Sequence, residues 1–476
     1  MGAARHPCSQ SIPGIINFLA IPVYTRLLSP AEYGLYILVA AAASFGNIVF
    51  FDWIRQSLLR FLPRHLDDTR RFLGNVLLVF LLCALAVATT ISAVAHTVLN
   101  SVPSSLIWLG IGVMVSQAWF ELNLELSRSL LKPAVFGAML TLRAALSLLV
   151  GVLFIRLLHL SASAPLYGLL VGMMLATMVW LRPHWGSATL HLDKGMTAQM
   201  MRFGLPLTFS LLSTFLIGLS DRFLISYYLG VQAAGAYAAS YDLVQQTVAY
   251  VMSSISMAVY PIVMRSVEKD GDEAVFHHTR QALSLLVAAS APVVAVLCIF
   301  ASQISRLFLG REFHSTAISL MPWLAVSMLL SGIRAYYYDM AFQISRQTAW
   351  HALVLGIAAL VNVGLNIWWI PRFGIIAAAY ATFLSLLAAL ICSIVLGRKF
   401  TPLPVCWSDI GKVALALAVG CAAGLLLLLY VPQGSIISLI FQVGGCIILY
   451  LGMLVALNTA NSRAILHTLT RQRRLV

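Results

Sequence analysis

Long apolar runs, separated by short polar breaks, occupy nearly the whole sequence. A helix needs about 20 mainly apolar residues to cross the hydrocarbon core of a bilayer, so each run predicts a membrane-spanning helix. The runs are continuous, unlike the alternating strands of about ten residues that build a membrane barrel. Fourteen spans are predicted, at 11–29, 34–54, 72–98, 103–126, 133–158, 164–182, 203–229, 232–261, 279–309, 317–342, 348–370, 374–397, 408–431 and 434–458.

Composition supports the same fold class. Hydrophobic residues make up 61% of the 476 and charged residues only 10%, whereas a soluble domain is about half apolar and a quarter charged. The seven cysteines are scattered singly, without the spacing of a metal site or a disulfide framework. The chain is therefore predicted to be an all-α integral membrane protein with no metal.

Basic residues gather in alternate loops, which predicts the orientation in the membrane. Five arginines fall between the second and third spans and four in the last 14 residues, whereas the loops of the opposite side together hold only five. Loops rich in Lys and Arg face the cytoplasm, so both termini are predicted to be cytoplasmic. The net charge of +14 is then a consequence of topology. No soluble basic face with stacking aromatics is present, so no nucleic-acid partner is expected.

A short motif recurs 201 residues later in the chain and predicts an internal repeat. The motif pairs Leu28, Gly34 and Tyr36 with Leu229, Gly235 and Tyr237. Six helices separate the copies, so both copies enter the membrane in the same direction and are expected to be related by a pseudo-two-fold axis along the membrane normal. The predicted organisation is an N-lobe (1–182), a cytoplasmic linker (183–202), a C-lobe (203–400), and two additional helices with a basic cytoplasmic tail (401–476).

Several stretches resemble a known transporter family. They are PVYTRLLSPAEYGLYILV, FFDWIRQSLLRFLP, FGLPLTFSLLSTFLIGLSDRFLISYYLG and NVGLNIWWIPRFGIIAAAYAT. Their order and spacing resemble the polysaccharide transporter family, which includes the O-antigen and exopolysaccharide flippases. Its superfamily also holds the lipid II flippase and the multidrug and toxic compound extrusion pumps. The likeness covers residues from about 12 to 400, and the last two predicted helices match in hydropathy only.

The resemblance implies a function. The expected cargo is an oligosaccharide repeat unit on an undecaprenyl pyrophosphate carrier, moved from the cytoplasmic to the outer leaflet of the bacterial inner membrane by alternating access. A polysaccharide polymerase and other surface-polysaccharide assembly proteins are the expected partners.

Three other functions are open to an α-helical membrane protein of this kind. An ion-coupled drug or small-solute antiporter on the same scaffold predicts an acidic lumen, whereas the fifth, seventh and tenth spans each contain an arginine. A lipid II flippase differs only in the sugar head of its cargo. A membrane polysaccharide polymerase predicts a long outer loop, and the outer loops are short. No catalytic or nucleotide-binding motif is evident, so we expect no enzyme activity and no cofactor.

Arginines within the predicted spans are candidates for cargo binding. An ionisable group at membrane depth is costly unless it faces a cavity or a partner, and guanidinium groups fit phosphate oxygens well. Arg143 lies deepest, and its alternative role is a structural pair with Glu121 or Glu125. Arg222 is a second candidate cavity cation, and Arg26 lies at the outer end of the first span.

The tenth span contains the sequence IRAYYYDMAF. In an α-helix Arg334, Tyr337 and Tyr338 share one face, which suits a sugar phosphate; the alternative is an interfacial aromatic belt. Acidic groups in or near the spans are candidates for charge pairing or for coupling to H⁺ or Na⁺. These acidic candidates are Asp52, Glu121, Glu125, Asp221, Asp242 and Asp339. Asp242 is a candidate partner of Arg222, and a packing role is the alternative for Arg222. Asp52 has an interfacial cap as its alternative role.

Overall fold

A computed structural model describes residues 8–65, 67–98, 103–186, 188–269, 271–430 and 435–458. These residues form helices and connecting turns and contain no β-strand. The chain divides into two compact units, 1–235 and 236–476, each described here by itself.

The first unit begins with seven long helices and ends within the eighth. They are α1 (Cys8–Leu27), α2 (Pro30–Phe61), α3 (Thr69–Val98), α4 (Ser104–Ser129), α5 (Pro133–Leu158), α6 (Ser163–Trp185), α7 (Lys194–Leu229) and the first turn of α8 (Val231–Lys269), with a short 3₁₀ turn, η2 (Leu62–Arg64), after α2.

The second unit continues along α8 and contains the remaining elements. They are α9 (Asp272–Ile299), α10 (Ala301–Phe308), η3 (Arg311–Phe313), α11 (His314–Ile333), η4 (Arg334–Tyr338), α12 (Met340–Ile344), α13 (Thr348–Phe373), α14 (Ile376–Gly397), α15 (Trp407–Tyr430) and α16 (Ile436–Ala456).

The all-helical membrane fold is confirmed. Among the described residues, eleven helices are long and apolar enough to cross a membrane, and two shorter apolar helices cover Ile12–Leu27 and Ser163–Met178. Every predicted span falls on a helix, although the ninth divides into α9 and α10 and the tenth is interrupted by η4. A total of fourteen membrane-spanning helices is compatible with this set and stays a prediction.

The turn between α1 and α2 follows from its sequence, LLSPAEYG. Ser29 caps α2 by accepting a hydrogen bond from the backbone of Glu32, and the Glu32 carboxylate accepts one in return from the backbone N–H of Ser29 at 2.9 Å. Pro30 follows at the first helical position, where its missing N–H costs nothing. This reciprocal capping box fixes where α1 ends and α2 begins.

The two glycines of the repeated motif meet at one helix crossing. A Cβ atom added to Gly34 of α2 would overlap the carbonyl oxygen of Val231, and one added to Gly235 would overlap the carbonyl oxygen of Pro30. Residues 30 and 34 correspond to residues 231 and 235 by the offset of the repeat. Exchanging the two copies of the motif therefore leaves the pattern of contacts unchanged, as a two-fold rotation requires. The motif therefore marks a local pseudo-two-fold contact, which explains why both copies keep a glycine.

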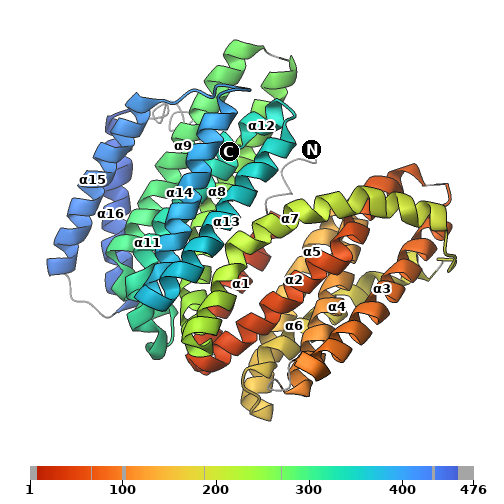
Figure 1. Ribbon diagram of the computed structural model, residues 1–476. Coiled ribbons are helices and arrows are strands. Elements are labelled where there is room, and N and C mark those ends of the chain that lie inside the picture. Colours follow the sequence, from red (N-terminus) through yellow and green to blue (C-terminus); the bar gives the residue numbers. More distant parts are fainter. Residues whose placement is uncertain are drawn as a thin grey trace, which may run out of the picture. The chain divides into compact units, whose positions relative to one another are not determined.

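Helix α7 packs along α2 (Figure 1). The rings of Phe45 and Phe215 lie 5.6 Å apart, those of Phe61 and Phe203 lie 5.7 Å apart, and Ser57 Oγ donates to the carbonyl oxygen of Met200 at 2.8 Å. These contacts with α7 lie along the second half of α2, from Phe45 to Phe61.

Helix α7 begins nine residues before its predicted start at 203. Asp193 is its N-cap and accepts from the backbone N–H of Met196 at 3.0 Å. The backbone N–H of Asp193 in turn donates to Asn75 Oδ1 of α3 at 2.8 Å. Much of the expected linker 183–202 is therefore helical and bound to α3. Grouping by contact places α7 in the same compact unit as α2. The predicted lobe boundaries, 1–182 and 203–400, stay a prediction.

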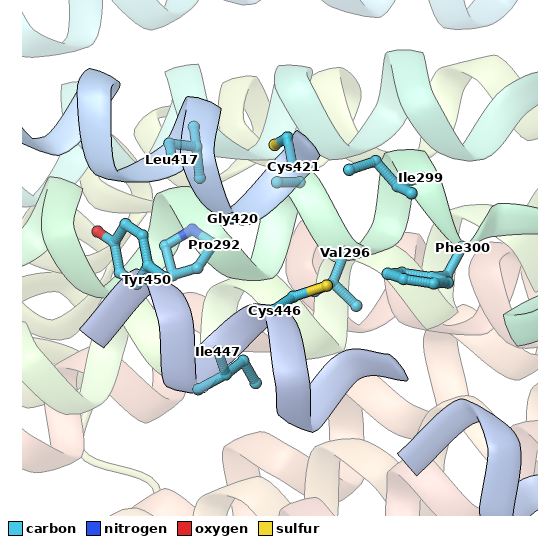
Figure 2. Close-up of a pocket in the computed structure, with 11 residues that line it drawn as sticks. Pro292, Val296, Ile299, Phe300, Leu417, Gly420, Cys421, Cys446, Ile447 and Tyr450 are labelled. Atoms are coloured by element: carbon cyan, nitrogen blue, oxygen red, sulfur yellow. The ribbon is translucent and has the colours of Figure 1, made fainter. Parts of the chain in front are cut away.

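In the second unit, α15 and α16 form a hairpin against α9 (Figure 1). Tyr450 donates its hydroxyl to the carbonyl oxygen of Ala288 at 2.7 Å, beside a small core that includes Ala291 and Val413. A neighbouring cavity between these three helices has a volume of about 20 Å³. Pro292, Cys421 and Cys446 are among the residues that line it (Figure 2). Its walls are almost wholly apolar, so it is a packing defect of about one water's size rather than a polar site.

Candidate functional site

A network of polar side chains joins α2 and α4 inside the first unit. Glu121 lies at its centre: its Oε2 accepts from Asn47 Nδ2 at 2.9 Å and its Oε1 accepts from Gln117 Nε2 at 3.0 Å. Gln117 Oε1 in turn accepts from Ser44 Oγ at 3.1 Å. Gln117 and Glu121 are four residues apart and therefore share one face of α4. These bonds offset much of the desolvation of a carboxylate at membrane depth.

Arg55 links two of the predicted acidic residues within this network. Its Nη1 lies 2.7 Å from Glu121 Oε2, and its Nη2 forms an ion pair with Asp52 one turn earlier on α2. The side chain of Asp52 is only 2% exposed, whereas those of Arg55 and Glu121 are each 24% exposed. Asp52 is thus a buried carboxylate paired with a half-buried arginine, and the interfacial-cap alternative stays a prediction.

Arg143 of α5 lies close to this network. Its guanidinium carbon stands 5.3 Å from the centre of the Phe120 ring, which is a cation–π geometry. Glu121 is the acidic group whose charge acts on it most strongly. In the described part of the chain Glu121 is ion-paired with Arg55, and Glu125 with Arg128 at 3.6 Å. The predicted alternative, a structural pair between Arg143 and Glu121 or Glu125, stays a prediction.

The remaining predicted site residues of the first unit lie on α1 and α7. Asp221 and Arg222 are buried, at 0% and 7% exposure, and both make further contacts within the protein. Arg26 is exposed in the last turn of α1. Asp242, the candidate partner of Arg222, belongs to the second unit and is half-buried. The pairing of Arg222 with Asp242 stays a prediction.

A second charged cluster lies in the second unit and consists of Arg334, Asp339, His351 and Ser393; we call it the Asp339 cluster. Arg334 Nη1 lies 2.8 Å from Asp339 Oδ2, and His351 Nε2 lies 3.2 Å from the same oxygen. Ser393 Oγ donates to Asp339 Oδ1 at 2.7 Å. One carboxylate thereby joins η4, α13 and α14. Arg334 and Asp339 are themselves buried, at 7% and 1% exposure.

The predicted arginine–tyrosine face takes a different form, because residues 334–338 form a π-helical turn. The backbone N–H of Asp339 donates to the carbonyl oxygen of Arg334 at 2.8 Å, five residues back, so the α-helical spacing assumed from sequence does not hold. Tyr337 is fully buried and donates to the carbonyl oxygen of Pro404, while Tyr338 is half-buried. The residue that contacts Arg334 is therefore Asp339 and not one of the two tyrosines. A π-helical turn inside a helix is frequent at functional sites.

Sequence reasoning missed His351 and Ser393, which complete the Asp339 cluster. It also missed a buried amide group between α13 and α14, where Asn366 Nδ2 donates to Asn362 Oδ1 at 3.1 Å and Asn362 Nδ2 reaches Ser385 Oγ at 3.5 Å. Two asparagines four residues apart in an apolar span are a signal that could have found it, because polar side chains there bind neighbouring helices.

An apolar groove opens between α2, α3 and α4, with a volume of about 300 Å³. It is lined only by apolar side chains and one glycine, including Leu35, Ile91, Ile107 and Met114. Such a surface accommodates hydrocarbon and offers no donor to a sugar or a phosphate.

Comparison with known families identifies the chain. The model of the family described as "Polysaccharide biosynthesis protein" matches residues 2–267, more than half of the sequence. The chain belongs to this family. A second model, MatE, matches residues 206–368. The resemblance found from sequence motifs is thereby confirmed, and the protein is a multi-pass membrane transporter of the flippase superfamily. The matched families comprise transporters and flippases. No curated protein matches the sequence.

Solved structures share the fold. A lipid II flippase MurJ in an inward closed conformation has a TM-score of 0.72 at 13% identity, covering 95% of this chain and 98% of its own. A multidrug resistance MATE family transporter of the MOP superfamily, in an inward-facing conformation, has a TM-score of 0.64 at 17% identity, covering 82% and 97%. The 5% of this chain left unmatched is shorter than α15 and α16 together, so the likeness extends beyond α14 into at least one of the last two helices.

Proposed function

We propose that the protein is a flippase that moves a lipid-linked oligosaccharide from the cytoplasmic to the outer leaflet by alternating access, for the assembly of a surface polysaccharide. The match of the polysaccharide biosynthesis family to residues 2–267 carries this proposal. The cargo is an oligosaccharide repeat unit on undecaprenyl pyrophosphate. The protein would then lie in the bacterial inner membrane with both termini in the cytoplasm, beside the polymerase that consumes its product.

Arg143 is the residue that we assign to the pyrophosphate. Its guanidinium is held by the Phe120 ring, and Glu121 and Glu125, its alternative partners, are ion-paired with other arginines. A cation positioned in this way keeps donors for an anion, and guanidinium offers two parallel hydrogen bonds to phosphate oxygens. Arg26, Arg222, Arg334, Tyr337 and Tyr338 complete the proposed cargo-binding set.

Two other cargoes are compatible with the same scaffold. The TM-score of 0.72 with the lipid II flippase favours a lipid II-like cargo as the second candidate, in which only the sugar head differs. The MatE match at residues 206–368 favours a drug antiporter. The antiporter is less well supported, because Asp52 and Glu121 are paired with Arg55 and do not form an acidic surface for a cationic drug.

A sidedness assay in cells tests the proposal. Deleting the gene should cause lipid-linked oligosaccharide to accumulate in the inner leaflet, where an impermeant reagent added outside cannot reach its sugars. Normal outer-leaflet levels in the deletion strain would refute the proposal. Accumulation of lipid II instead would favour the second candidate.

A further inference from the structure

The Asp339 cluster places two nitrogen donors on one carboxylate oxygen. Arg334 Nη1 and His351 Nε2 both reach Asp339 Oδ2, at 2.8 and 3.2 Å, while Ser393 occupies Oδ1. A carboxylate only accepts hydrogen bonds, so His351 Nε2 carries the proton that it shares with Asp339. With a neutral imidazole, the charges of Arg334 and Asp339 cancel.

His351 is the most exposed of the charged and titratable members of the cluster. Its side chain is 37% exposed, whereas the side chains of Arg334 and Asp339 are 8% and 2% exposed. Histidine is also the side chain that ordinarily changes charge between pH 5 and 8. The imidazole therefore offers a protonation site at the exposed edge of an otherwise buried ion pair.

A proton on His351 leaves the cluster with an uncompensated positive charge. Asp339 is the only acidic residue between positions 334 and 400, so η4, α12, α13 and α14 supply no second carboxylate. The other titratable or charged groups on or next to these elements near this end are Tyr336, Tyr337, Tyr338, Arg346, Cys392, Arg398 and Lys399, and none of them is a carboxylate. Two further helices pack against η4: α9 carries Glu273, His277, His278 and Arg280, and α11 carries His314. Two cations would then compete for one oxygen.

We propose that His351 is a proton-binding site that controls Arg334: proton uptake loosens Arg334 from Asp339 and makes its guanidinium available to a phosphate-type anion. The π-helical turn provides the freedom for this change, because Arg334 and Asp339 begin and close that turn. If the proposed function holds, the pyrophosphate of the cargo is the anion. Proton binding and cargo binding then strengthen each other by the same factor.

Hydrogen exchange on the full chain in lipid nanodiscs, without cargo, tests the proton site. The backbone amides of residues 334–351 should lose protection at least threefold between pH 8 and pH 5.5, after correction for intrinsic exchange. His351→Gln keeps a donor for Asp339 but cannot take up a proton, so its corrected protection should not change with pH. His277→Gln, at an exposed histidine on α9, should respond like the wild type.

A wild type without this pH response, or a response that survives in H351Q, overturns the proposal. H351N serves the same purpose if H351Q fails to insert. Inorganic pyrophosphate is the probe for the second step, in which Arg334 becomes available to an anion. Between pH 8 and pH 5.5 the affinity of the wild type for pyrophosphate should rise by a factor at least fivefold larger than that of H351Q. Equal changes in the two proteins overturn that step. Neither arm uses lipid-linked cargo, so loss of flipping with both results intact would refute the proposed function alone.

Discussion

The crossing of α2 with the start of α8 predicts that Gly34→Ala destabilises the protein. The added methyl group would meet the carbonyl oxygen of Val231 and lie 3.0 Å from the backbone nitrogen of Gly235. Both atoms belong to the backbone, so no side chain can rotate away and the two helices must separate. Overpacking of this kind costs about 1–3 kcal/mol, against a gain of about 1 kcal/mol for replacing glycine in a helix.

The matched control is Gly364→Ala on α13, where an added Cβ would have no neighbour within 4 Å. This variant should be as stable as the wild type or more stable, by up to about 1 kcal/mol. Equilibrium unfolding in a detergent titration, with free energies compared at one detergent fraction, measures both. Gly34→Ala should fall below the control by about 1–3 kcal/mol.

The local two-fold contact sharpens this test. Gly235→Ala should cost about the same as Gly34→Ala, because each methyl group meets the equivalent carbonyl oxygen of the other helix. The double variant should cost less than the two single costs added together, since one separation of the helices relieves both overlaps. A Gly34→Ala protein as stable as Gly364→Ala would refute the reasoning from close approach.

Three further predictions concern the charged groups and the energy source. Arg143→Ala should abolish export in cells while the protein still inserts and folds. Arg143→Lys should restore export only in part, because an ammonium lacks the planar fork of a guanidinium. Export by Arg143→Ala at the wild-type level would exclude the phosphate role. The backbone N–H of Met196 holds the pKa of Asp193 below its usual range, so this N-cap contributes stability above the unfolded pKa and loses it as pH falls through the folded pKa. Asp193→Asn keeps the cap and should remove that part of the acid dependence in hydrogen exchange of the first turn of α7, and an unchanged pH profile would contradict it. Uncouplers should slow flipping in cells, since the sequence has no nucleotide-binding motif; an undiminished rate would leave only downhill transport driven by consumption of the cargo outside.

The spans could be predicted because their cause is local in the sequence. A run of apolar residues has no stable state in lipid other than a helix, and the Ser29–Glu32 capping box specifies the start of α2 from four residues. The repeated glycines could be noticed as a pair, although only the structure shows that they touch.

The clusters could be predicted only in part, because they depend on contacts between helices. Arg143 and Asp339 stood out as charges within apolar spans, but nothing in the spacing indicates that Arg55 pairs with Glu121, 66 residues away. His351 lies near the start of α13, where a polar residue is unremarkable by sequence. The π-helical turn at 334–338 shifts the register of that segment, so the assumed α-helical face of Arg334 and its tyrosines could not be read correctly from residue spacing.

Flipping of a defined cargo by the purified protein tests the central claim most directly. The protein is reconstituted into sealed vesicles that carry radiolabelled undecaprenyl pyrophosphate oligosaccharide in both leaflets, and an impermeant glycosidase is added outside. We predict that the enzyme cleaves nearly all of the labelled sugar in vesicles with wild-type protein, and only the outer-leaflet half in vesicles with Arg143→Ala or without protein. Cleavage that stops at the outer half with the wild type would contradict the account.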